Sequence, residues 1–276
     1  MKKRLNAFVL AAFFSVLTHY AYAQPPVFGP EFFFGEAGES KRVIKEFSVQ
    51  DTGKKYILSI QSGENRGKNN KVTISINGKR VALPDELRER LMVTEPATLQ
   101  KKNEISVEIA GEADAPFLVT IMNTEEHTAT AQIPRIGGVV GIEGYAAVLF
   151  PSGSFSTSQN VTITVTAEQH FEANVTVPHL PYEIRINSGD HPPAKDVHVS
   201  VNVTDSLMDS DYAMYLFVQM HGTPDVPDLH DKLFKINSGV DDILKMVKAT
   251  LPRHAFSNLY SKNGTYEATF TVGLAR

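Results

Sequence analysis

The chain has 276 residues with no cysteine and no tryptophan, and its formal net charge at pH 7 is −4. A cysteine-free sequence has no disulfide bond, thiol nucleophile or thiolate metal site. The mildly acidic charge argues against binding to nucleic acid or anionic lipid, because both need clustered lysine and arginine.

The first 23 residues have the pattern of a secretory signal peptide. A basic start, Lys2–Arg4, precedes the apolar run Ala7–Leu17, and Ala21–Ala23 supplies the small residues of a cleavage site. The apolar run is shorter than the roughly 20 residues that a membrane-spanning helix needs. We therefore expect residues 1–23 to be removed after Ala23, and we expect a bacterial protein that is secreted, periplasmic or on the cell surface.

Most of the following sequence has the pattern of strands. Residues 24–35 combine proline and glycine with Phe32–Phe34, and we interpret them as a lead-in segment that covers a sheet edge or docks a partner. Apolar and polar residues then alternate, which predicts strands with one face in a core and the other in water, at residues 41–49, 54–62, 71–78 and 103–111. Residues 115–122 are more continuously apolar, which predicts a strand covered on both faces.

Turn and helix signals are fewer. Asn77-Gly78 and Asn263-Gly264 predict tight hairpins, because these residues accept the positive φ angles of a type I′ turn. Residues 84–92 begin with proline and carry acids before bases, which predicts a short helix. Residues 240–251 fit neither period cleanly, so helix and strand both stay open. The predicted fold class is all-β, as two tandem β-sandwich domains.

A polar stretch with one proline and a closing glycine pair, residues 123–138, divides the chain. We therefore predict an N-terminal β-sandwich over residues 36–125, a linker over 126–136 and a second β-sandwich over 137–276. The chain is long enough for such modules to bury apolar cores without disulfide bonds.

The second module begins at Gly137-Gly138 and continues into an apolar strand, residues 145–150. A turn follows at Pro151–Ser154, where we expect a positive φ at Gly153, and residues 159–167 then alternate as a half-exposed strand. This succession predicts strands joined by a tight turn.

The same succession resembles the ZU-type β-domain, named for zona-occludens proteins and netrin receptors, which also occurs in bacterial extracellular proteins. Ser152 replaces the second proline of the family's turn, and the resemblance covers residues 137 to about 205. The first module is weakly similar to β-sandwich modules of secreted bacterial proteins. Both resemblances imply adhesion or scaffolding, and neither brings catalytic residues.

The sequence contains no recognisable catalytic motif. Ser152, Ser154 and Ser156 lack the Gly-x-Ser-x-Gly arrangement of a nucleophile elbow, so we interpret them as turn residues. The histidines form no His-Glu-x-x-His zinc pair. We therefore predict no catalytic, cofactor-binding or metal-binding residues.

Two polar segments leave a weakly held divalent cation as an alternative. Residues 221–232 carry imidazole and carboxylate groups in a proline-broken loop, namely His221, Asp225, Asp228, His230 and Asp231. Asp209 and Asp211 are spaced like the start of a calcium loop, but its glycine and terminal glutamate are missing. Without a bound cation, we interpret both segments as ordinary solvent-exposed loops.

The sequence thus favours a non-catalytic exported protein that acts in adhesion, binding or structural support. We expect a protein or cell-surface ligand as partner, no nucleic acid and no membrane-spanning segment after signal cleavage, and the sequence leaves the oligomeric state open. The alternatives are a metal-assisted hydrolase using the His221–His230 loop and an accessory fragment of a larger secreted enzyme.

Overall fold

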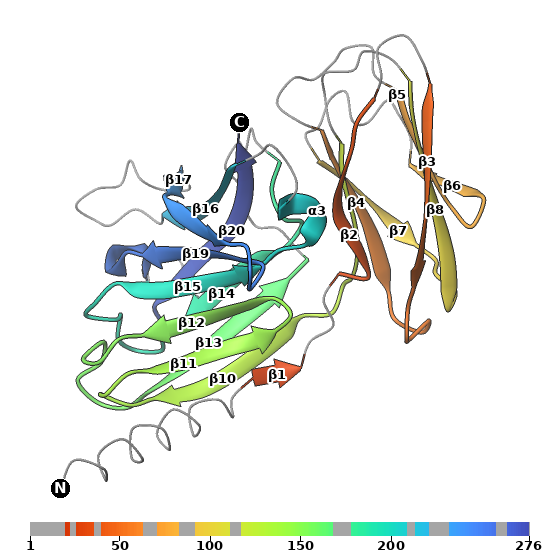
Figure 1. Ribbon diagram of the computed structural model, residues 1–276. Helices are drawn as coiled ribbons and strands as arrows, with labels where there is room; N and C mark the ends of the chain where they lie inside the picture. Colours follow the sequence, from red (N-terminus) through yellow and green to blue (C-terminus); the bar gives the residue numbers. More distant parts are fainter. Residues whose placement is uncertain are drawn as a thin grey trace, which may run out of the picture.

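The computed structural model describes residues 20–22, 26–35, 40–62, 71–82, 92–110, 117–167, 178–208, 213–220, 232–257 and 264–275. Their regular structure is nearly all strand, arranged as two β-sandwiches beside one another (Figure 1). This confirms the predicted all-β fold of two tandem sandwiches. Among these residues no helix is long and apolar enough to cross a membrane.

The first sandwich consists of two four-stranded sheets. One sheet has the order β2 (Phe28–Phe33), β9 (Phe117–Asn123), β4 (Tyr56–Ser62) and β7 (Met92–Ala97). The other has the order β3 (Lys41–Ser48), β8 (Lys102–Ala110), β5 (Lys71–Ile76) and β6 (Lys79–Ala82). Apolar side chains of both sheets meet in one core, among them Leu58, Ile74, Val107 and Val119.

The second sandwich consists of two six-stranded sheets. One has the order β1 (Tyr20–Tyr22), β11 (Gly138–Glu143), β12 (Ala146–Phe150), β15 (Val197–Asn202), β19 (Met246–Leu251) and β18 (Ser238–Asp241). The other has the order β10 (His127–Ile133), β13 (Gln159–Thr166), β14 (Glu183–Asn187), β20 (Glu267–Ala275), β16 (Ala213–Met220) and β17 (Lys232–Ile236). The described residues of this part also form two short helical turns, α3 (Asp205–Met208) and η3 (Arg253–Ala255).

Several local predictions are confirmed. Asn77 and Gly78 have φ angles of 52° and 76° and join β5 to β6, as a type I′ turn requires. Gly153 has a φ of 78° in the turn after β12. Every residue of β9 is buried, so the strand predicted to be covered on both faces is so covered.

The predicted linker, residues 126–136, is corrected, because β10 occupies most of it. Small alanines at 129 and 131 alternate with threonines, so the stretch reads as polar although its alanines are buried. Thr130 lies opposite Thr162 of the neighbouring strand β13, with 2.8 Å between the hydroxyl oxygens. The connection from β9 of the first sandwich to β10 of the second is therefore only residues 124–126.

The prediction of a water-facing side for residues 54–62 is also wrong. Ser59 and Gln61 are buried, because the second sandwich lies against this face of β4. Residues 240–251, left open between helix and strand, form the β18–β19 hairpin. The predicted helix 84–92 lies outside the described residues except for Met92, which begins β7, and Asn263 of the second predicted hairpin also lies outside them.

The two sandwiches share an apolar and polar junction. Leu118 and Met122 of β9 pack into the same cluster as the core of the second sandwich. Gln61 Nε2 donates to the carbonyl oxygen of His179 at 2.6 Å, and the His179 amide donates to Gln61 Oε1 at 2.8 Å. Thr204, just before α3, donates its hydroxyl to the Pro30 carbonyl at 2.8 Å. The β2–β9–β4 surface thus has a neighbour on both faces.

Candidate functional site

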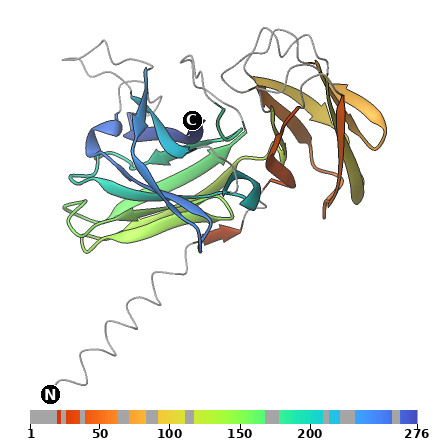
Figure 2. The ribbon, with the colours of Figure 1, turned by 45° about the horizontal axis from the view of Figure 1, so that its top comes forward.

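The outer face of the β1–β11–β12–β15–β19–β18 sheet is the candidate site. Period-2 alternation sends Val148, Val199 and Val247 into the core of the second sandwich. The alternate residues of the same strands point outward, and Leu149, His198 and Lys248 among them are exposed. We call this surface the open face. Figure 2 shows the sheet from a second direction, with the first sandwich lying to one side of it.

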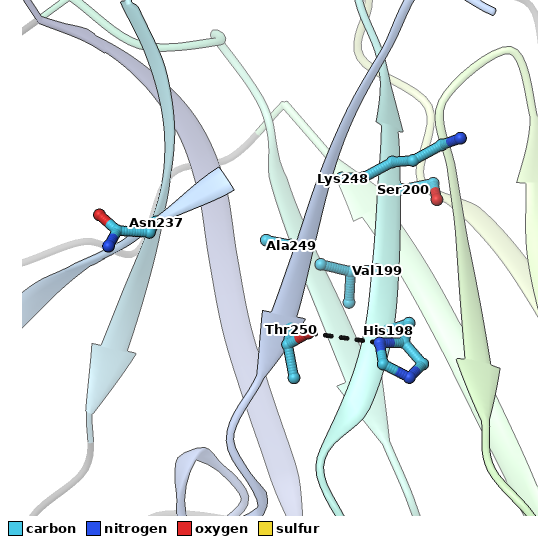
Figure 3. Close-up of a pocket in the computed structure, with 7 residues that line it drawn as sticks. All are labelled: His198, Val199, Ser200, Asn237, Lys248, Ala249 and Thr250. Atoms are coloured by element: carbon cyan, nitrogen blue, oxygen red, sulfur yellow. Dashed lines mark hydrogen bonds between the residues drawn. The ribbon is translucent and has the colours of Figure 1, made fainter. Parts of the chain in front are cut away.

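Three depressions are lined by residues of this sheet and its turns. One of about 350 Å³ is lined by His198, Val199, Ser200, Asn237, Lys248, Ala249 and Thr250 (Figure 3). A second, of about 410 Å³, lies at the β18–β19 turn, and a third, of about 500 Å³, lies between the β11–β12 turn and Met246. Ligand pockets in proteins have comparable volumes, but they enclose the ligand far more than an exposed sheet face does.

Pairing register sets the side chains of the first depression side by side. Leu149 lies opposite His198 on β15, and His198 lies opposite Thr250 on β19. His198 Nδ1 is 3.3 Å from Thr250 Oγ1 (Figure 3). This row offers an apolar group, an imidazole and a hydroxyl for contact with a partner.

Two of the charged side chains beside the second depression, Lys248 and Asp241, pair with each other. Lys248 Nζ donates to Asp241 Oδ2 at 2.6 Å, and the Leu244 amide donates to Asp241 Oδ1 at 2.9 Å. The Lys248 hydrogen bond, followed by the Leu244 bond, lowers the pKa of Asp241. Asp241 is therefore held as a carboxylate by its neighbours, which suits a structural role rather than proton transfer.

The turn between β18 and β19 exposes apolar side chains. Ile243 is 91% exposed and Leu244 is 56% exposed, and Val240 of β18 is also exposed. Contiguous exposed apolar groups rimmed by charge are typical of surfaces that bind another protein. The sequence alone gave no reason to place these residues at the surface, because a turn with two large apolar residues looks like part of a buried element.

A cluster of one histidine and two tyrosines lies near the junction of the sandwiches. The His127 ring is 5.3 Å from that of Tyr145, which meets Tyr182 edge-on at 5.2 Å between ring centroids. Burial raises the pKa of Tyr145, and burial followed by the nearby Tyr145 raises the pKa of Tyr182. Burial and the Lys54 charge lower the pKa of His127, and Glu125 opposes them. These groups pack against one another, so we assign the cluster to the junction.

The predicted turn serines remain turn residues. Ser154 Oγ donates to the Pro151 carbonyl at 2.8 Å, so its hydroxyl serves the turn itself. Phe32 and Phe33 of the aromatic run are buried in the two cores, whereas Phe34 is exposed. The run thus supports packing between and within the sandwiches.

The proposed cation segments fall outside the described part of the chain. Asp209, Asp211 and residues 221–231 are not among the described residues, and Lys232 begins β17. Within the ranges that the structure does describe, no three His, Cys, Asp or Glu side chains gather as metal ligands would. The described histidines are His127, His179, His191, His198 and His254, which are well separated in the sequence.

Comparison with known proteins identifies no family. No known family and no curated protein matches the chain. Among solved structures, the chain is similar to a cycloisomaltooligosaccharide glucanotransferase of Paenibacillus sp., with 11% identity, a TM-score of 0.23, and coverage of 86% of this chain and 41% of that one. It is also similar to dimeric latent PorU from Porphyromonas gingivalis, with 9% identity, a TM-score of 0.19, and coverage of 90% and 19%. The chain spans less than half of either protein, and TM-scores this low carry no argument about function.

Proposed function

We propose that the protein is an exported, non-catalytic binding module that engages another protein through the open face. The observation that carries the proposal is the exposed apolar pair Ile243 and Leu244 at the margin of that face. Such a pair is costly to leave in water, and contact with a partner's apolar surface would remove it from water. The signal-peptide pattern of residues 1–23 supports export to the periplasm, the cell surface or the medium.

The chemistry of the open face supports binding rather than bond cleavage. Two of its charges, Lys248 and Asp241, are paired with each other within the protein. In its first depression the Thr250 hydroxyl lies 3.3 Å from His198 Nδ1, beyond the roughly 2.6–3.2 Å at which a base activates a nucleophile. The resemblance of residues 137 to about 205 to ZU-type β-domains agrees with an adhesive or scaffolding role.

The test is capture of proteins from an envelope extract of the source organism on the immobilised chain lacking residues 1–23. We expect a protein retained by the wild type to be reduced at least tenfold on the Ile243→Ser/Leu244→Ser variant. The matched control is Ile136→Ser, since Ile136 is 79% exposed in the turn between β10 and β11. Equal retention by all three proteins, or no retained protein, would remove the support for the proposal.

The hydrolase alternative has its own measurement. Elemental analysis of the purified protein should find no tightly held zinc or manganese. One equivalent of either metal, lost on substitution of His221 and His230 by alanine, would favour metal-assisted catalysis instead.

A further inference from the structure

We propose that removal of the signal peptide exposes the edge of β11, and that this edge then accepts an extended segment of a partner protein as a parallel strand. The inference rests on the export step of the proposed function. It concerns a different surface from the open face, namely the backbone edge of the same sheet.

The first observation is the place of β1. Tyr20, Ala21 and Tyr22 pair in parallel with Gly141, Ile142 and Glu143 of β11. The other strand pairs in the described part of the chain are antiparallel. Figure 1 shows β1 at the margin of the second sandwich, and the backbone pairing places it beside β11. The three residues of β1 lie on the leader side of the expected cleavage point after Ala23, so cleavage would remove them and leave β11 in place.

The second observation is that β11 has its own support. Residues Gly138–Ile142 pair with Ala146–Phe150 of β12 on the other side. Val140 and Ile142 are buried in the core of the second sandwich. The strand therefore remains formed without β1, and its backbone groups on the vacated side have lost their protein partners. Unpaired backbone groups of this kind are what strand addition uses.

The third observation concerns the protection of sheet edges. Proteins discourage strand addition by placing lysine, arginine or proline in edge strands. Such residues occur in β3, β6, β7 and β17, as the sequences KRVIKEFS, KRVA, MVTEPA and KLFKI show. The β11 sequence, GVVGIE, contains none of these three residue types, although it ends on the charged Glu143. The edge strands β10 and β18 also lack them, so this feature makes the β11 edge permissive to pairing without setting it apart from those two.

The new N-terminus cannot take the vacated place. The Val27 amide already donates to the Ile121 carbonyl at 2.9 Å, and β2 follows in the first sandwich. Only Gln24, Pro25 and Pro26 stand between the cleavage point and Val27, and proline has no backbone N–H to donate. The occupant is therefore a segment of another protein, proline-free over at least three residues, for which Tyr-Ala-Tyr is the template.

The test uses the chain beginning at Gln24 and a labelled peptide of residues 17–23, LTHYAYA, with binding followed by fluorescence anisotropy. Successive residues of a strand direct their backbone groups to opposite sides, so only alternate amides face β11. We therefore compare two singly N-methylated peptides, one modified at Ala21 and the other at Tyr22. We expect one of the two to bind at least tenfold more weakly and the other to bind as the unmodified peptide does. A scrambled peptide of the same composition is the control. Equal effects at the two positions, or no binding of LTHYAYA, would overturn the proposal.

Two further measurements separate this inference from the proposed function. The mass of the exported protein shows whether residues 1–23 have been removed, and a retained leader would contradict export with cleavage while leaving the peptide result unaffected. The Ile243→Ser/Leu244→Ser variant should bind the peptide as the wild type does.

Sedimentation of the cleaved chain alone tests whether a second copy of this chain occupies the edge. Dimers that dissociate on addition of LTHYAYA would show that the occupant is this chain itself and not a partner protein.

Discussion

The two sandwiches use their sheets differently. In the first, the β2–β9–β4 surface is covered by its own core on one side and by the second sandwich on the other, so Ser59 and Gln61 are buried although they are polar. In the second, the open face carries His198, Lys248 and Leu149 into solvent. The contrast agrees with the proposal that the first sandwich is a support through this sheet and that the open face binds a partner.

Shortening a buried side chain of the covered sheet should have the largest effect on stability. Leu118 is 1% exposed and packs into the core of the second sandwich, so Leu118→Ala should lower the free energy of unfolding by about 2–5 kcal/mol. The matched change on the open face, Leu149→Ala, should cost no more than about 0.5 kcal/mol. Urea unfolding of both variants measures the difference. Equal costs would mean that the two sheets are not distinguished by burial.

The polar contact across the junction should have the next largest effect. Gln61→Leu removes both hydrogen bonds to the backbone of His179 and should cost about 1–3 kcal/mol, because buried backbone groups then lack partners. Gln132→Leu, at an exposed position of β10, is the control and should be nearly neutral. Thermal unfolding and limited proteolysis of residues 124–126 would report the loss. An unchanged melting temperature would show that the contact does not hold the sandwiches together.

A smaller effect is expected from pH. Burial, followed by the Lys54 charge, lowers the pKa of His127 in the folded protein below its ordinary value of 6.5, against a raising influence of Glu125. The unfolded chain therefore binds this proton more readily. As pH falls from about 6.5 to the folded pKa, His127 lowers the free energy of unfolding, and below the folded pKa the loss stays constant. Melting temperatures at pH 7.5 and 5.5 should differ less for His127→Gln than for the wild type. An identical pH dependence would assign the effect to other groups.

The smallest change in stability should come from the turn of the open face. Ile243→Ser/Leu244→Ser should leave the free energy of unfolding within about 0.5 kcal/mol of the wild type, since both side chains are largely exposed. Urea unfolding checks this value. A loss of several kcal/mol would mean that the pair serves folding, and the comparison between a supporting and a recognising sandwich would fail with it.

The fold was largely predictable from local patterns, because alternation and turn chemistry act over a few residues. The β5–β6 hairpin follows from Asn77-Gly78, and the double burial of β9 follows from its apolar run. The covered side of β4 was not predictable, since the neighbour that buries Gln61 comes from His179, far away in the sequence. β10 escaped detection because Ala129 and Ala131 give a weak hydrophobic signal although they are buried.

The candidate site was less predictable than the fold. Exposure of Ile243 and Leu244 depends on where the β18–β19 turn lies relative to both sheets, and residue type gives no hint of it. The alignment of Leu149, His198 and Thr250 requires the pairing register of three strands that are distant in sequence. The cation segments at Asp209 and at the His221–His230 loop stay predictions, because they fall outside the described residues.

The hydrogen bonds of Gln61 to His179 have a consequence for tolerated variation. Both hydrogen bonds of Gln61 join it to main-chain atoms of residue 179, so these bonds place no demand on the side chain there, except that proline would lack the donor. Position 61 has no such freedom, because a side chain carrying both a donor and an acceptor at that reach is needed. Homologues of this chain should therefore keep an amide at position 61, whereas the identity of the buried residue at position 179 is not dictated by these two hydrogen bonds.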